Sequence, residues 1–112
     1  TTTPSNATLT WYRLDSSMSQ SAHTQWLEDL ASNQTAANLL RLYLPKGWLL
    51  YDRSGAGSDS NCSSRALHAI LVSDEGDRYY VALHLLAPAK TPLMQRDAIM
   101  QKAIEVIYRQ LN

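Results

Sequence analysis

The sequence contains a single cysteine, no excess of either charge and no long apolar run. With Cys62 alone, no internal disulfide can form. Lysine plus arginine number 10 and aspartate plus glutamate number 10, and the positive residues are scattered, which argues against a nucleic-acid partner. No apolar run approaches the length needed to cross a bilayer, so we predict no membrane insertion by this segment.

The length and composition are those of one folded domain. The chain has 112 residues, of which 45% are hydrophobic and 18% charged, and a chain of this size can bury a substantial core. We assign residues 9–112 to a single domain. The polar stretch 1–8 is interpreted as a linker or disordered tail.

The first half of the chain predicts one strand followed by helices. Apolar and polar residues alternate over 7–14, which favours a strand. Residues 22–31 have the apolar spacing of a helix, and residues 35–44 predict a second helix or turn. Pro45 and Gly47 end this segment.

The second half predicts strands joined by short connections, and then a long helix. Strands are expected at 48–52, 66–72 and 79–86, with a loop over 55–64 and a tight hairpin at 74–77. Thr91 and Pro92 are a favoured helix start. The helix should run to about Leu111 with a stripe facing the sheet, which contains Leu93, Asp97, Met100, Ile104, Ile107 and Leu111, widened by Ile99, Ala103 and Val106.

These elements predict an α+β fold, an antiparallel sheet of about four strands with helices packed on it. The strands at 66–72 and 79–86 are apolar at nearly every position, so both faces of the sheet must be covered. Helices cover one face. The other face needs a second domain, a partner chain or the N-terminal segment. Of these, a homodimer or another domain of the parent protein is the expected cover.

The remaining reactive side chains do not predict a metal or cofactor site. His68 and His84 fall on neighbouring strands and can face each other, but two histidines alone do not make a zinc site. Cys62 lies in the polar loop and is expected to be an unreactive surface thiol. We therefore predict no cofactor.

Two motifs carry a resemblance to a known family. Residues 41–48 read RLYLPKGW, and residues 52–57 read DRSGAG a short distance later. Together they resemble the class A β-lactamase and penicillin-binding-protein-like serine hydrolases, in which an Arg-x-x-Leu-Pro-x-x-Trp run precedes a Lys-Ser/Thr-Gly strand. Arg-Ser-Gly occurs at this place in carbenicillin-hydrolysing members. The likeness spans about residues 25–111 and implies the C-terminal α/β part of that fold.

The resemblance implies a carboxylate-binding site. The Ser54 hydroxyl would donate to a substrate carboxylate, with Arg53 adding a charge-assisted contact. The backbone N–H of Ala56, after Gly55, would be one half of an oxyanion hole. In many members an arginine at the place of Arg65 also contacts the carboxylate.

The catalytic elements of the family are missing from the 112 residues. No serine has a lysine three positions later, Ser-Asp-Asn is absent, and the glutamate that activates water has no counterpart. These elements belong to an all-helical half, expected between the strand at 7–14 and the helix at 22, where only a short polar turn stands. We therefore predict that the chain is not an enzyme.

Three hypotheses follow. The first, which the short connection favours, is a non-catalytic module for ligand or protein binding, for instance the exported sensory or docking domain of a larger protein. The second is the C-terminal fragment of a class A β-lactamase-type hydrolase whose nucleophile lies elsewhere. The third is a structural oligomerisation domain. The resemblance implies a periplasmic or extracytoplasmic location.

Overall fold

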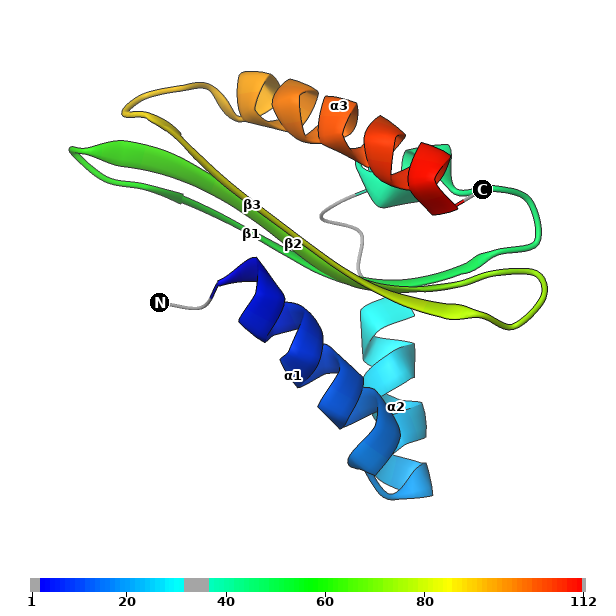
Figure 1. Cartoon of the computed structure of the whole chain (residues 1–112). Helices are drawn as coiled ribbons and strands as arrows, with labels where there is room; N and C mark the ends of the chain where they lie inside the picture. The colour runs from blue at the N-terminus through cyan, green and yellow to red at the C-terminus, as the bar shows by residue number, and fades with distance from the viewer. Residues whose placement is uncertain (1–2, 32–36, 112) are drawn as a thin grey trace.

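The computed structural model describes residues 3–31 and 37–111. Figure 1 shows three layers, with the sheet between one long helix on one face and two helices on the other. The elements in chain order are α1 (Pro4–Ser17), α2 (Gln20–Ala31), the 3₁₀ turn η1 (Leu40–Tyr43), β1 (Leu49–Ser58), β2 (Cys62–Val72), β3 (Arg78–Pro88) and α3 (Leu93–Leu111).

The fold class is the predicted one, with three strands in the described residues. The sheet is antiparallel in the order β1-β2-β3. Its register pairs Leu50 with Leu71 and Ile70 with Tyr80. The predicted turn at 74–77 joins β2 to β3, and Gly76 has a positive φ of 91° there, which glycine adopts without strain.

The strand predicted at 7–14 is wrong, because these residues lie in α1. Thr3 caps this helix by accepting the N–H of Asn6 at 3.1 Å, and Pro4 occupies the first turn. The residues that α1 buries are Ala7 and Trp11, which are four apart, a helical rather than a strand spacing. Residues 4–8 of the expected tail are therefore helical, while residues 1 and 2 lie outside the described part.

This correction removes one argument for a non-catalytic module, the argument from the short connection. That argument required a sheet strand before the helix at 22, and thus a missing helical half between them. In the structure α1 leads directly into α2, so no sheet strand precedes them within residues 3–31. The short connection is a turn between two helices.

The loop predicted at 55–64 is also mostly strand. β1 and β2 continue their pairing to Ser58 and Ser63, and Asp59 closes the hairpin by accepting the N–H groups of Asn61 and Cys62 at 2.7 and 2.9 Å. Cys62 is thus the first residue of β2, half-buried and without a disulfide.

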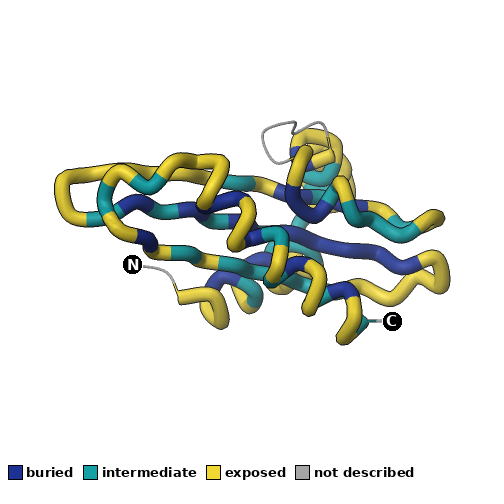
Figure 2. Tube along the Cα trace, turned by 90° about the horizontal axis from the view of Figure 1, so that it is seen from above, coloured by how far each residue is buried: buried dark blue, intermediate teal, exposed yellow. Residues whose placement is uncertain are grey.

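Both faces of the sheet are covered by helices of the same chain. The face under α3 holds the main core, in which Leu67 and Leu71 of β2 pack with Met100 and Ile104. The opposite face holds a smaller cluster of Trp11, Leu30, Ile70 and Val72. Figure 2 shows the resulting buried stretch along the middle of the sheet, with exposed hairpin ends. The expectation of a homodimer rested on a bare face, and the structure removes that premise.

The final helix follows the prediction closely, but its apolar stripe is narrower. Met100 and Ile104 are buried, whereas Leu93 and Ile99 are about half exposed at 45% and 50%. The Thr91 hydroxyl bonds the carbonyl of Pro88. None of the helices in the described ranges combines the length and hydrophobicity required to span a membrane. The predicted segment 35–44 is described only from residue 37, and there forms turns and η1.

Candidate functional site

The predicted carboxylate-binding residues lie on an edge strand. Residues 53–56 are in the middle of β1, which pairs with β2 on one side only. Among the described residues no strand pairs with its other side. An open edge presents backbone N–H and C=O groups to a ligand or another chain.

The register sends the side chains of Arg53 and Ser54 to opposite faces. Ser54 stands opposite Leu67, which belongs to the core under α3. Arg53 stands opposite His68, whose ring contacts Trp11 of α1. Successive side chains of a strand alternate between faces. The Arg53 and Ser54 side chains can therefore contact the same ligand only at the open edge of β1, which each side chain would reach from its own face of the strand.

Arg65 makes its contacts within the fold. Its side chain is only 5% exposed, and its Nε donates to Asp97 Oδ1 of α3 at 2.7 Å. Its Nη1 donates to the carbonyl of Gly55 at 3.3 Å. The guanidinium thus fastens the middle of β1 and β2 to α3, which argues against a direct contact with a ligand.

The sequence analysis missed a second arginine in this anchor. Arg96 of α3 is 9% exposed and donates through Nη1 to the carbonyls of Gly57 and Ser64, at 3.1 and 2.7 Å. The one sequence feature that indicates these buried polar contacts is Asp97, which interrupts an otherwise apolar stripe of α3. Together Arg65, Arg96 and Asp97 hold the strand that carries residues 53–56 in place.

A buried carboxylate lies next to the site along β1. Asp52 is 1% exposed and accepts from Nη2 of Arg41 at 3.1 Å. Burial raises the pKa of Asp52, and Arg41 only partly offsets that rise. Asp52 lies on the α3 face of β1, the same face as Ser54 and the opposite face to Arg53, so only Arg53 leaves the strand away from this carboxylate.

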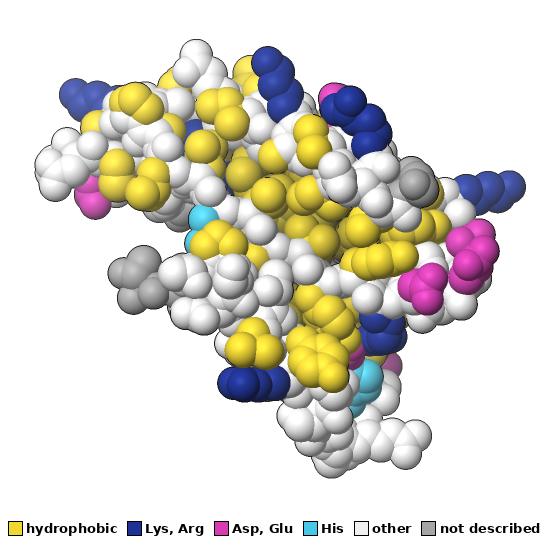
Figure 3. Space-filling view, viewed as in Figure 1, with side chains coloured by type: hydrophobic (Ala, Val, Ile, Leu, Met, Phe, Trp, Pro, Cys, Tyr) yellow, Lys and Arg dark blue, Asp and Glu magenta, His cyan; other side chains and the backbone are white. Residues whose placement is uncertain are grey.

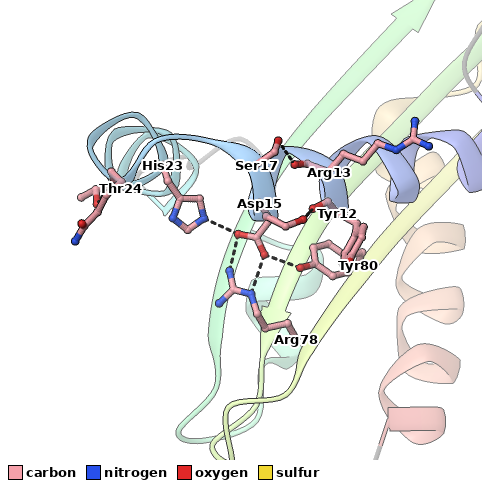
Figure 4. A network of polar contacts seen from close by, with 10 residues as sticks. Tyr12, Arg13, Asp15, Ser17, His23, Thr24, Arg78 and Tyr80 are labelled. Atoms are coloured by element: carbon pink, nitrogen blue, oxygen red, sulfur yellow. Dashed lines mark hydrogen bonds and ion pairs between the residues drawn. The ribbon is translucent and has the colours of Figure 1, made fainter.

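A polar cluster on the opposite face had no sequence signal. Asp15 of α1 accepts from Nε and Nη2 of Arg78 at 2.8 and 2.7 Å, from the hydroxyl of Tyr80 at 2.6 Å, and contacts Nε2 of His23 at 2.7 Å (Figure 4). Burial alone would raise the pKa of Asp15, but hydrogen bonds from Arg78, Tyr80 and His23 lower it overall. The cluster joins α1 and α2 to the end of β3.

Comparison of the sequence with known proteins identifies relatives of this chain. No protein-family model matches the chain. Beta-lactamase CARB-4 of Pseudomonas aeruginosa is 32% identical over 103 residues, which cover 90% of this chain and 35% of that protein. Beta-lactamase BRO-1 of Moraxella catarrhalis is 30% identical over 95 residues, covering 81% of this chain and 29% of that protein. The chain is homologous to one part of the class A β-lactamases.

Solved structures agree with this relationship. The chromosome-encoded β-lactamase of Vibrio parahaemolyticus matches with a TM-score of 0.87 and 29% identity, over 99% of this chain and 41% of that chain. A reconstructed ancestral class A β-lactamase of Gram-negative bacteria matches with a TM-score of 0.83 and 21% identity, over 99% and 42% of the two chains, which shows the fold alone. The chain spans about a third of the length of the curated relatives it matches.

Proposed function

We propose that this chain is a ligand-binding module of the class A β-lactamase type, which holds a carboxylate at the open edge of β1 and has no hydrolytic activity by itself. The observation that supports the proposal most directly is the position of residues 53–56 on that edge. The ligand class follows from the relatives, which are named as β-lactamases. By the same relationship we propose that the protein acts outside the cytoplasm, in the periplasm.

The chemistry of the edge suits an anion. Arg53 is exposed and brings a positive charge, Ser54 brings a hydroxyl, and the Ala56 N–H is a backbone donor on the same strand. A solvent-exposed charged contact contributes below about 1 kcal/mol. Binding to the chain alone should therefore be weak, with dissociation constants of about a millimolar or more.

The test is an amide-shift titration with a simple penicillin, compared with its methyl ester, which lacks the carboxylate. The amides of Ser54, Gly55 and Ala56 should move with the acid and stay still with the ester. Arg53→Gln should weaken the response. Arg109→Gln, which removes an exposed charge from α3, is the matched control and should bind normally. Equal shifts with acid and ester would contradict the proposal.

Hydrolysis is tested separately. A chromogenic β-lactam should be hydrolysed at the background rate, because the chain contains neither a Ser-x-x-Lys pair nor Ser-Asp-Asn. A stable acyl adduct detected by mass spectrometry would show a nucleophile that the motifs do not reveal.

A second candidate function is supported by the other edge of the sheet, where no strand of residues 3–31 or 37–111 pairs with the outer side of β3. There a groove of about 730 Å³ runs between α1 and α3, lined in part by Leu9, Tyr12, Val81 and Val106. Figure 3 shows hydrophobic surface across this side, between the helix layers. An apolar groove beside an open strand suits another segment of a parent hydrolase, which would carry the nucleophile. Restoration of hydrolysis on mixing the chain with the remainder of such a parent protein would favour this candidate.

A further inference from the structure

Two histidine side chains meet on the sheet face that carries α1 and α2. His68 of β2 stands opposite Ala82, and His84 of β3 stands opposite Ala66, so the histidines are diagonal neighbours on one face. Their Nε2 atoms are 2.8 Å apart and their ring centroids 5.1 Å apart. The prediction that they can face each other is confirmed.

This geometry brings two nitrogen ligands to one point. At 2.8 Å one neutral ring donates its Nε2–H and the other accepts with its Nε2 lone pair. The neutral imidazole is the form that binds metals. The shared proton occupies the position in which a metal ion could bind both nitrogens.

We propose that His68 and His84 form a two-histidine site for a divalent transition-metal ion, with Cu(II) preferred over Zn(II) and water completing the coordination. Imidazole suits both ions, and Cu(II) binds a given nitrogen site more tightly. Metal–nitrogen bonds of about 2.1 Å separate the two nitrogens by about 3.0 Å at the right angle of a tetragonal Cu(II) site, and by about 3.4 Å at the tetrahedral angle of Zn(II). His84 is exposed, so its ring can rotate by the small amount required.

The surroundings limit the affinity without blocking the ion. Arg53 stands opposite His68 on the same face, and its positive charge opposes a cation. Because Arg53 is exposed, water screens this repulsion. The described residues contain no group of three or more histidine, cysteine, aspartate or glutamate side chains arranged for a metal. Because His84 is exposed, the site is open on its solvent side, and we expect reversible binding of one ion rather than a structural metal.

Trp11 provides a reporter within the fold. Its ring lies 5.9 Å from that of His68, edge to face, so bound Cu(II) should quench its fluorescence. The experiment titrates the whole chain with Cu(II) chloride at pH 7.5, in a Cys62→Ser background that prevents thiol oxidation. Saturable quenching at one equivalent is expected, with a weaker affinity for Zn(II) measured by competition.

The three histidines of the chain supply the controls. His68→Gln and His84→Gln should each raise the apparent Kd by more than about tenfold, since even outer-shell changes cost 10–100-fold. His23→Gln removes the histidine that contacts Asp15 instead and should leave the Kd unchanged. Circular dichroism checks folding, and His84→Gln carries the test if the half-buried His68 position proves intolerant.

Electron paramagnetic resonance gives a second measurement. The bound Cu(II) should show coupling to two imidazole nitrogens in the background protein and to one in either variant. Equal Kd values in all three histidine variants, or a spectrum without imidazole coupling, would overturn the proposal. The carboxylate titration contains no metal, so the two proposals fail independently.

Discussion

The two faces of the sheet are held by different kinds of interaction. Under α3, apolar side chains from all three strands pack with Met100 and Ile104, and the Arg65–Asp97 pair is buried among them. Under α1 and α2 the apolar cluster is smaller, and the Asp15 cluster supplies much of the attachment through Arg78 and His23, which are 37% and 28% exposed. One face therefore depends on dry packing and the other on polar contacts near water.

The shapes of the layers explain this difference. Figure 1 shows α3 lying along the sheet, whereas α2 extends away from it. A helix that lies along a sheet buries a full stripe of side chains, while one that meets it at an end buries a few. Polar contacts at the rim then carry a larger share of the attachment on the α1 and α2 face. This contrast can be tested by removing one residue at a time from each face.

The largest effect is expected at Asp97. Its replacement by alanine leaves Arg65 buried without its carboxylate and also removes the acceptor of Asn38, 3.0 Å away. Breaking a buried ion pair from one side typically costs about 3–5 kcal/mol. Urea denaturation should show a loss of this size for Asp97→Ala. Glu105→Ala, on the exposed side of the same helix, should change the unfolding free energy by less than about 0.5 kcal/mol.

The next effect concerns packing under α3. Ile104 is fully buried, whereas Ile99 of the same helix is 50% exposed. Ile104→Ala should reduce the unfolding free energy by about 2–5 kcal/mol through lost burial and a cavity. Ile99→Ala should cost about 1 kcal/mol or less. Similar losses at both positions would mean that α3 uses the wider stripe predicted from the sequence.

Local signals predicted most of the fold. The turn residues at 74–77 predict the β2–β3 hairpin, and Thr91 with Pro92 predicts the start of α3. Both signals act within a few residues, so they can be recognised in the sequence. α1 was missed because its cap, Thr3 with Pro4, was interpreted as part of a tail, while Leu9 and Trp11 happened to alternate with polar residues. The contacts that fix α1 are distant in sequence: Asp15 bonds Arg78 across 63 positions.

The motif at 52–57 predicts where the candidate site lies along the chain, but it does not predict the geometry of the site. Residues 52–57 marked the strand, yet the pattern could not show that β1 is an edge or that Arg53 and Ser54 leave it on opposite faces. The partner of Arg65 lies 32 residues away, so its burial could not be seen locally. Asp97 within an apolar stripe was a usable signal, since a buried carboxylate requires a cationic or hydrogen-bonding partner.

A smaller, pH-dependent effect is expected on the α1 and α2 face. Asp15→Asn removes the charge that Arg78, Tyr80 and His23 surround. Hydrogen bonds to charged groups are worth about 1.5–3 kcal/mol, and the exposure of Arg78 reduces this. We expect a loss of about 1–2 kcal/mol at pH 7, measured by urea denaturation.

The sign of the pH dependence follows from the lowered pKa of Asp15. Its contribution is fully present above the ordinary carboxyl value of 3.8 and is lost as pH falls through the lower pKa of the folded protein. The stability gap between wild type and Asp15→Asn should shrink as the pH falls below about 4. Comparing the two proteins cancels the contribution of Asp52. A gap that grows as the pH falls below about 4 would contradict this account.

The smallest effect on stability is expected at the edge of β1, where a substitution should reduce ligand binding without reducing the unfolding free energy. Arg53 is exposed, and neither core cluster includes it. Arg53→Gln should therefore change the unfolding free energy by less than about 0.5 kcal/mol, while it reduces the amide shifts that a penicillin causes at residues 54–56. Arg65→Gln should do the opposite, destabilising the fold by breaking the pair with Asp97. If Arg53→Gln destabilised the protein as strongly as Arg65→Gln, Arg53 would be a structural residue. That result would contradict the proposal that the β1 edge is a binding site.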